Sequence, residues 1–117
     1  MFQSILVSLI RRIRGARWAM LVATDGVLLE TCPVALPEAD AIAAENAVLY
    51  RSMRRCVAAR GEALSTATLS TSGGKLLFQD LTPDYFLLVS LAPDGQAGKA
   101  CFEIARMRHT LERELVF

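Results

Sequence analysis

Two apolar runs joined by an Asp-Gly pair restrict the fold more than any other feature of this sequence. Residues 16–23 read ARWAMLVA, Asp25 and Gly26 follow, and a second apolar run covers 27–31. Asp-Gly between apolar runs is typical of a β-hairpin with a tight primed turn, in which both central residues have positive φ. The nearly continuous apolar character of the first run also predicts that helices cover both faces of the sheet.

Hydrophobic periodicity and turn residues predict three helices and three further strands around this hairpin. The helices are expected at 2–14, 38–60 and 97–115, and the strands at 63–71, 75–79 and 85–91. This order lacks the regular βαβ alternation of a parallel nucleotide-binding sheet. We therefore expect one domain over 1–117 of the α/β class (α+β type), a three-layer α-β-α sandwich with a five-stranded antiparallel sheet.

Composition limits the possible partners and the compartment. Apolar residues make up 53% of the chain, more than a small domain needs for its own core, which favours burial of some surface in an oligomer. The net charge of +1 does not favour nucleic acid. Three widely spaced cysteines without a CxxC pair predict a reducing, cytoplasmic setting. The apolar segment 2–10 is far shorter than the roughly 20 residues of a membrane span, so we expect no membrane insertion.

Groups that could perform catalysis are scarce. His109 is the only histidine, and without partner ligands it predicts no metal site. Ser72-Gly73-Gly74-Lys75 resembles part of a phosphate loop, but it joins two strands and lacks the Walker spacing. Asp25 is explained by its turn. We therefore expect no enzyme activity, no cofactor and no metal.

The predicted helix 38–60 has two distinct faces. One side is apolar and carries Ile42, Leu49, Met53, Cys56 and Val57, with Ala43 and Tyr50 at its edge. The opposite face carries Arg51, Arg54 and Arg55, interleaved with Ala44, Ala47 and Ala58. Such a face is either a solvated basic surface or a surface for a partner protein, since arginine is enriched at interfaces.

Taken in order, these features resemble a known family. A short helix leads into Gly15-Ala16 and an apolar strand, and Asp25-Gly26 leads into a second strand. An alanine-rich helix, a glycine-turned hairpin, a strand starting near Tyr85 and a final helix after Ala97-Gly98 follow. This order and spacing resemble the Roadblock/LC7 family over essentially the whole chain, and within it the bacterial MglB-like branch.

The resemblance implies a profilin-like fold and a non-catalytic homodimer joined through the second helix and the third strand. On this sequence the implied dimer interface includes Ala44, Ala47, Arg51, Leu64, Thr66 and Thr68. The strand 63–71 is rich in Ser and Thr, and a strand of this kind at a sheet edge can pair with its own copy. Paired helices would then engage a small Ras-like GTPase. The family has no sequence signature for that contact, and we select Arg51, Arg54 and Arg55 as partner-binding candidates because they cluster on one side of the helix.

Three functions remain open at this point. The first is regulation of a small Ras-like GTPase, by activation or as a scaffold. The second is a dimeric structural adaptor that links proteins without an effect on nucleotide turnover. The third is a PAS-like small-molecule sensor, which would need a roomy apolar pocket with converging polar groups.

Overall fold

The computed structural model describes residues 2–115, and within them the helices and strands follow the predicted order. They are α1 (Phe2–Arg12), β1 (Ala16–Ala23), β2 (Leu28–Cys32), α2 (Ala39–Ala58), β3 (Thr66–Thr71), β4 (Gly74–Thr82), β5 (Tyr85–Leu91) and α3 (Ala97–Glu114). The bounds differ most in the central hairpin, where β3 begins at Thr66 instead of 63 and β4 ends at Thr82 instead of 79. None of the helices in this range is long and apolar enough to cross a membrane.

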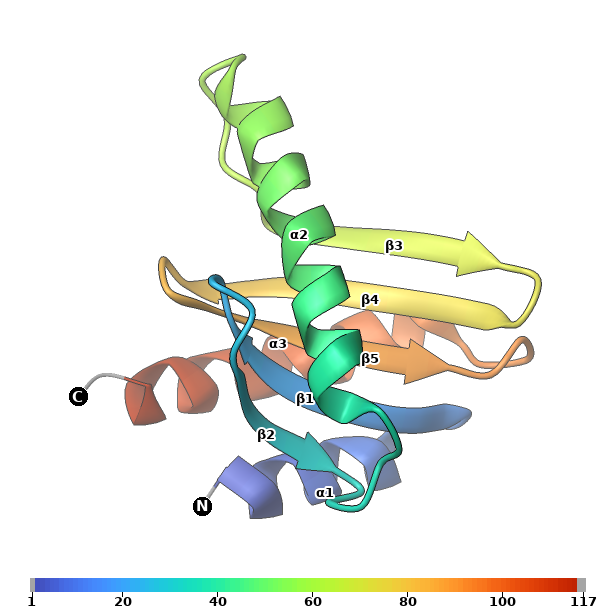
Figure 1. Cartoon of the computed structure of the whole chain (residues 1–117). Helices are drawn as coiled ribbons and strands as arrows, with labels where there is room; N and C mark the ends of the chain where they lie inside the picture. The colour runs from blue at the N-terminus through green and yellow to red at the C-terminus, as the bar shows by residue number, and fades with distance from the viewer. Residues whose placement is uncertain (1, 116–117) are drawn as a thin grey trace.

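The strands form one antiparallel sheet in the order β2-β1-β5-β4-β3. Helix α2 crosses one face of this sheet, and α1 and α3 lie side by side on the other face (Figure 1). The predicted three-layer α-β-α sandwich with a five-stranded sheet is therefore confirmed. Strands β1, β5 and β4 occupy the inner positions, while β2 and β3 form the two edges.

The loop between β1 and β2 differs from the predicted primed turn. Gly26 N donates to Ala23 O at 2.8 Å, and Ala23 N donates to Val27 O at 2.8 Å, so the loop comprises Thr24, Asp25 and Gly26. Gly26 has φ of 103°, whereas Asp25 is not among the residues with positive φ. Asp25 Oδ1 instead accepts a hydrogen bond from Val27 N at 3.1 Å. The hairpin is confirmed, but the turn is the longer type that a left-handed glycine closes.

Each face of the sheet carries its own hydrophobic core. Beneath α1 and α3 the buried residues include Leu6, Leu9, Leu21, Leu87, Ile104 and Leu111. Beneath α2 they include Met20, Ala43, Tyr50, Phe78, Phe86 and Leu88. Successive residues such as Met20 and Leu21 point to opposite faces and are both fully buried. Double coverage thus explains the continuous apolar runs, since each such side chain contributes about 1.5–3 kcal/mol on burial.

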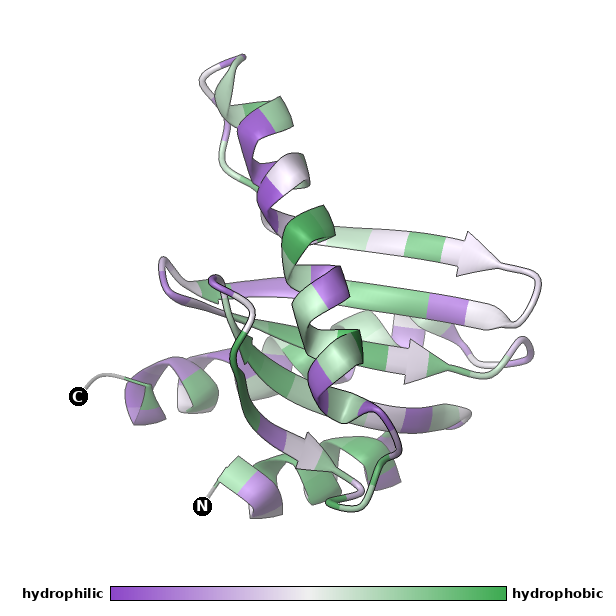
Figure 2. Cartoon of the chain, in the orientation of Figure 1, coloured by the Kyte–Doolittle hydropathy of each residue, from purple (hydrophilic) through white to green (hydrophobic). Residues whose placement is uncertain are grey.

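The sheet is not covered evenly. The C-terminal part of α2 extends past the β3 edge, and the half of the sheet face that carries the β3–β4 turn has no helix above it (Figure 1). Colouring by hydropathy shows β1 and β5 as largely hydrophobic and β3 as much paler (Figure 2). The uneven coverage leaves an open sheet edge beside a helix that overhangs it.

Candidate protein-interaction surface

Strand β3 is an open edge of the sheet. It pairs with β4 on one side only, and Thr66, Thr68 and Leu69 on it are exposed. Leu64, just before the strand, is half-buried against the core beneath α2. The free side of an edge strand presents unpaired backbone N–H and C=O groups, which can pair with a strand of another chain. Thr66 and Thr68 therefore lie where such a pairing would occur.

The outward face of α2 adjoins this edge and carries apolar as well as charged side chains, Glu45 and Arg55 among the exposed charged ones. Ala44, Val48 and Ser52 are exposed and follow one another at intervals of four residues, which places them on one side of the helix. Val48 is 56% exposed and the adjacent Leu49 is 38% exposed. Apolar side chains on a helix that overhangs an open strand edge form a surface suited to a protein partner. Sequence reasoning missed Val48 and placed Leu49 on the apolar side of the helix.

The buried face of α2 overlaps the apolar side of the sequence only in part, since Ile42 and Met53 pack against the core but are not its centre. The side chains with 0% exposure are Ala43, Ala47 and Tyr50, whereas Leu49 and Cys56 are exposed. Small alanines let the helix approach the sheet closely, and an alanine-rich helix has no single apolar stripe that periodicity can identify. Ala47, predicted for the dimer interface, packs in the core of its own chain. We therefore leave Ala47 out of the surface proposed below.

Two of the three candidate arginines hold loops of their own chain. Arg51 Nη1 donates to the carbonyl of Thr24 in the β1–β2 loop. Arg54 Nη1 donates to Pro83 O in the β4–β5 turn at 3.0 Å. Arg55 is exposed, and within residues 2–115 it donates only to the nearby Ser52 Oγ, at 3.3 Å. Of the three, Arg55 is therefore the one most available to a partner.

The two loops held by these arginines also contact each other. Thr24 N donates to Asp84 O at 2.8 Å, which links the β1–β2 loop to the β4–β5 turn. The guanidinium of Arg54 lies 5.5 Å from the centre of the Tyr50 ring, within cation–π range. The arginine side of α2 and these two turns thus form one connected surface at one end of the sheet.

Tyr50 fixes α2 against the sheet. Its ring stacks on Phe86 with 4.1 Å between ring centres, and its hydroxyl donates to Asp80 Oδ1 on β4. Burial raises the pKa of Tyr50, and the hydrogen bond to Asp80 raises it further. The phenol therefore stays neutral well above physiological pH and keeps its donor role. This contact joins residues distant in the sequence, so periodicity could not reveal it.

Within residues 2–115, no three or more His, Cys, Asp or Glu side chains are placed to hold a metal ion. His109 is exposed on α3. Cys32, Cys56 and Cys101 are free thiols, and burial raises the pKa of the Cys32 thiol. A raised thiol pKa lowers the thiolate fraction and with it the reactivity.

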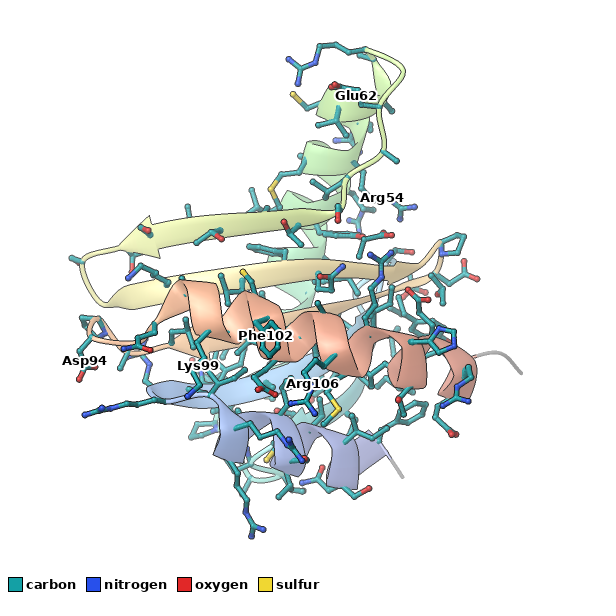
Figure 3. The ribbon with its side chains drawn as sticks, turned by 180° about the vertical axis from the view of Figure 1, so that it is seen from behind. Arg54, Glu62, Asp94, Lys99, Phe102 and Arg106 are labelled. Atoms are coloured by element: carbon teal, nitrogen blue, oxygen red, sulfur yellow. The ribbon has the colours of Figure 1, made fainter. Side chains whose placement is uncertain are left out.

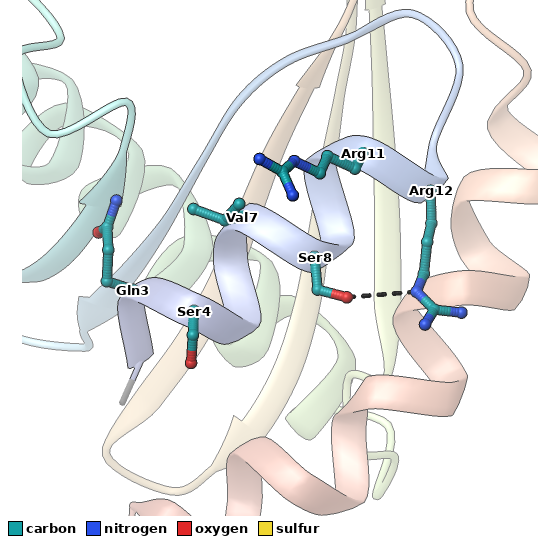
Figure 4. Close-up of a pocket in the computed structure, with 6 residues that line it drawn as sticks. All are labelled: Gln3, Ser4, Val7, Ser8, Arg11 and Arg12. Atoms are coloured by element: carbon teal, nitrogen blue, oxygen red, sulfur yellow. Dashed lines mark hydrogen bonds between the residues drawn. The ribbon is translucent and has the colours of Figure 1, made fainter.

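A hollow of about 810 Å³ lies on the outer surface of α1. Its lining residues are Gln3, Ser4, Val7, Ser8, Arg11 and Arg12, all from that one helix (Figure 4). Arg12 Nε donates to Ser8 Oγ at 3.2 Å, which occupies two of the polar groups. A sensor pocket would need walls from several elements to enclose a ligand. This hollow therefore does not resemble the pocket that the sensor function requires.

The arrangement of elements places the chain in a known structural class. Profilin IA of Acanthamoeba castellanii has a similar structure, with a TM-score of 0.66 over 97% of this chain and 98% of the profilin, at 11% identity. The protein therefore has a profilin-like α+β fold, in agreement with the predicted fold class.

Roadblock/LC7 domains are more similar still. The Roadblock/LC7 domain from Streptomyces avermitilis matches with a TM-score of 0.91 over 98% of both chains, at 18% identity. MglB of Myxococcus xanthus matches with a TM-score of 0.86 over 95% of this chain and 91% of that protein, at 15% identity. No protein-family model and no curated protein sequence matches the chain. These structures confirm the Roadblock/LC7 fold expected from the sequence, and at such identities they establish the fold alone.

Proposed function

We propose that the chain is a non-catalytic, homodimeric protein-interaction module that binds and regulates a small Ras-like GTPase in the cytoplasm. The observation that carries this proposal is the likeness to MglB over 95% of the chain. MglB-like members of the family act on such GTPases, as the sequence resemblance implied. In this proposal the GTPase binds the exposed side of α2. The opposite side of the helix is buried on the sheet and is closed to a partner.

Self-association follows from the open edge beside the overhanging helix. Two copies related by a two-fold axis can pair their β3 strands antiparallel, which satisfies the free backbone groups of both edges. Since part of α2 extends past the β3 edge (Figure 1), the same axis would bring the overhanging parts of the two α2 helices toward each other. We propose that the contact includes the predicted residues Ala44, Arg51, Leu64, Thr66 and Thr68. Two exposed apolar residues of α2, Val48 and Leu49, are added to this set.

The arginine side of α2 is the proposed contact for the GTPase. Arg55 is exposed and keeps most of its five donors free for carboxylate or carbonyl groups of a partner. Arg51 and Arg54 act indirectly in this proposal, since they hold the β1–β2 loop and the β4–β5 turn in place. Their removal would disturb these loops as well as any direct contact, so Arg55 gives the cleaner test.

Single-turnover GTP hydrolysis tests the proposal. We expect the cognate Ras-like GTPase to hydrolyse GTP faster when this protein is present. Arg55→Ala should weaken binding about tenfold, or about 1.4 kcal/mol. The matched control is Arg60→Ala. Arg60 is exposed, lies just past the end of α2 and pairs with Glu62. This variant should bind the GTPase as tightly as the unchanged protein does.

Three outcomes separate the alternatives. Binding without any change in hydrolysis rate would support the structural adaptor and overturn the activating role. No binding to the GTPase would overturn the proposal as a whole. Equal weakening by Arg55→Ala and Arg60→Ala would remove Arg55 as a specific contact and point to general charge attraction.

A further inference from the structure

Charge is divided unevenly between the two faces of the sheet. The segments that form α1 and α3 with their adjoining residues, 2–14 and 97–114, carry seven Lys or Arg and three Asp or Glu. The rest of the chain carries six Lys or Arg and nine Asp or Glu. The layer of α1 and α3 therefore has an excess of positive charge, although the net charge of the whole chain is only +1.

Much of this charge lies on one stripe of α3. Lys99, Phe102, Arg106, His109 and Arg113 follow one another at intervals of three or four residues, so they share one side of the helix. All five residues are exposed, whereas the opposite side of α3 packs on the sheet. The stripe therefore points away from the sheet, and Figure 3 shows its first three residues along the outer side of α3.

Helix α1 extends the basic surface beside this stripe. Arg11 and Arg12 are exposed in its last turn, and both line the hollow on its outer surface. The two helices pack against each other and cover the same face of the sheet (Figure 3). Their exposed cations therefore belong to one surface. We name this surface the basic face, and its residues are Arg11, Arg12, Lys99, Phe102, Arg106 and Arg113.

Most cations of the basic face have no acidic partner in the folded chain. Within residues 2–115, Arg11, Lys99 and Arg113 form no ion pair. Arg106 contacts Glu103 at 3.4 Å, yet its side chain is 54% exposed. Unpaired, exposed charges of one sign create a potential that attracts a surface of the opposite sign. The basic face is thus complementary to an anionic surface.

Phe102 indicates which anionic surface fits. Its side chain is 62% exposed, so it projects from the protein, and Lys99 and Arg106 flank it on the same stripe. A peptide partner would cover such a ring with a groove of its own. A bilayer accepts it directly, because an aromatic ring reaches the boundary of headgroups and acyl chains while neighbouring cations contact anionic headgroups. Contact of this kind is peripheral and needs no membrane-spanning helix.

The distribution of charge also favours a membrane over nucleic acid. Domains that bind nucleic acid are usually strongly basic as a whole, whereas the part of this chain outside the α1 and α3 segments has more acidic than basic residues. A bilayer meets only one face of a protein. The acidic remainder then lies on the side away from the anionic headgroups, where it causes little repulsion.

We infer that the basic face docks on an anionic lipid surface, with Phe102 in the headgroup region. Helix α2 covers the opposite face of the sheet, so it lies on the side away from the lipid (Figure 1). The α2 surface proposed for the GTPase therefore stays open in the docked protein. Docking itself involves neither α2 nor the GTPase, so the two proposals can fail independently.

Flotation of the full chain with lipid vesicles tests the inference. The probes are vesicles of phosphatidylcholine alone and vesicles of phosphatidylcholine mixed with phosphatidylglycerol, which is anionic. We expect the protein to float only with the mixed vesicles. Its affinity should fall as salt increases, because ions screen the attraction between the cations and the headgroups.

A charge reversal locates the contact. Lys99→Glu should weaken binding to the mixed vesicles about tenfold, since it replaces attraction by repulsion. The fold should be kept, because Lys99 is exposed in the first turn of α3, where an acidic side chain favours the helix dipole. Arg60→Glu is the matched control. It makes the same change in net charge at an exposed residue just past α2, and it should bind as the unchanged protein does.

Substitution of Phe102 separates the apolar contribution from the charge. Phe102→Ala should weaken binding about fivefold, and this ratio should persist at high salt, because burial of the ring is not electrostatic. The ratio for Lys99→Glu should instead shrink toward one as salt increases. Phe102→Trp should retain binding, since tryptophan favours the interface between a membrane and water.

Several results would overturn the inference. They are failure to float with the mixed vesicles, equal binding to both kinds of vesicle, and equal losses for Lys99→Glu and Arg60→Glu. Tighter binding to polyglutamate than to the mixed vesicles would assign the basic face to an acidic protein instead of a membrane. Tighter binding to a single-stranded oligodeoxynucleotide would assign it to nucleic acid.

Discussion

At the scale of single residues, polar contacts determine where α2 sits on the sheet. The helix has small side chains at Ala43 and Ala47 on its buried face, which allow close approach but give little preference for one position. Tyr50 provides that preference, because its ring stacks on Phe86 while its hydroxyl reaches Asp80. Arg51 and Arg54 add hydrogen bonds to two loops. A surface proposed for partner binding is thus held in position by groups that face inward.

Removal of the Tyr50 hydroxyl tests this view. Tyr50→Phe keeps the stacked ring but leaves Asp80 without its donor, so we expect a loss of about 1–3 kcal/mol in the free energy of unfolding. Urea denaturation of both proteins measures the difference. A double-mutant cycle with Asp80→Ala should give a coupling energy of about 1 kcal/mol between the two side chains. Additive effects of the two substitutions would contradict the assigned hydrogen bond.

The same pair predicts a pH dependence. The pKa of Tyr50 is raised above its ordinary value of 10.0 in the folded protein. Its contribution to stability is therefore complete below about pH 10 and is lost as the pH rises through the folded-state pKa. The stability difference between the unchanged protein and Tyr50→Phe should narrow in this alkaline range. If the stability difference between the two proteins stays constant from neutral to strongly alkaline pH, ionisation of Tyr50 is not linked to unfolding.

At the scale of elements, α2 and β3 together make the proposed dimer contact, and a buried charge should break it. Val48→Asp places an unpaired carboxylate in that contact, so we expect a shift from dimer to monomer, with at least about 3 kcal/mol of dimer stability lost. Val34→Asp is the control, since Val34 is 68% exposed and lies in the loop before α2. Sedimentation velocity of both variants measures whether each is a monomer or a dimer. If Val48→Asp is still a dimer, this face of α2 is not part of the dimer contact.

Elements were predicted well from the sequence where local signals agree, and less well where one element packs on another. Tyr85–Leu91 is apolar, β-prone and bounded by turn residues, so the strand was found at its full length. The buried face of α2 was found only in part, because Ala43 and Ala47 are too small to mark an apolar stripe. Arg54 donates a hydrogen bond to Pro83 O, in a turn that is distant in the sequence and lies close only in the folded chain. No local pattern encodes such contacts, which form only after the sheet and helix have packed.

At the scale of the whole molecule, two cores make a stable sandwich but leave one side of it incomplete. The β2 edge lies beside α1, whereas the β3 edge is open next to the overhanging part of α2 (Figure 1). Closing that side with a second copy would bury the edge backbone and the exposed Val48 and Leu49. The proposed dimer would thereby account for part of the surplus of apolar residues noted in the composition.

If folding and pairing are coupled in this way, thermal stability must depend on protein concentration. A dimer that unfolds to two chains gains about 1.4 kcal/mol for each tenfold rise in concentration, because mass action favours the associated state. For two chains of 117 residues this corresponds to an increase in Tm of roughly 3 °C per decade. Differential scanning calorimetry from about 5 to 500 μM, a range around the micromolar affinities of modest dimers, measures it. The Tm of Val48→Asp should not depend on concentration, whereas that of Val34→Asp should. A Tm that is independent of concentration in the unchanged protein would contradict a dimer that dissociates as it unfolds.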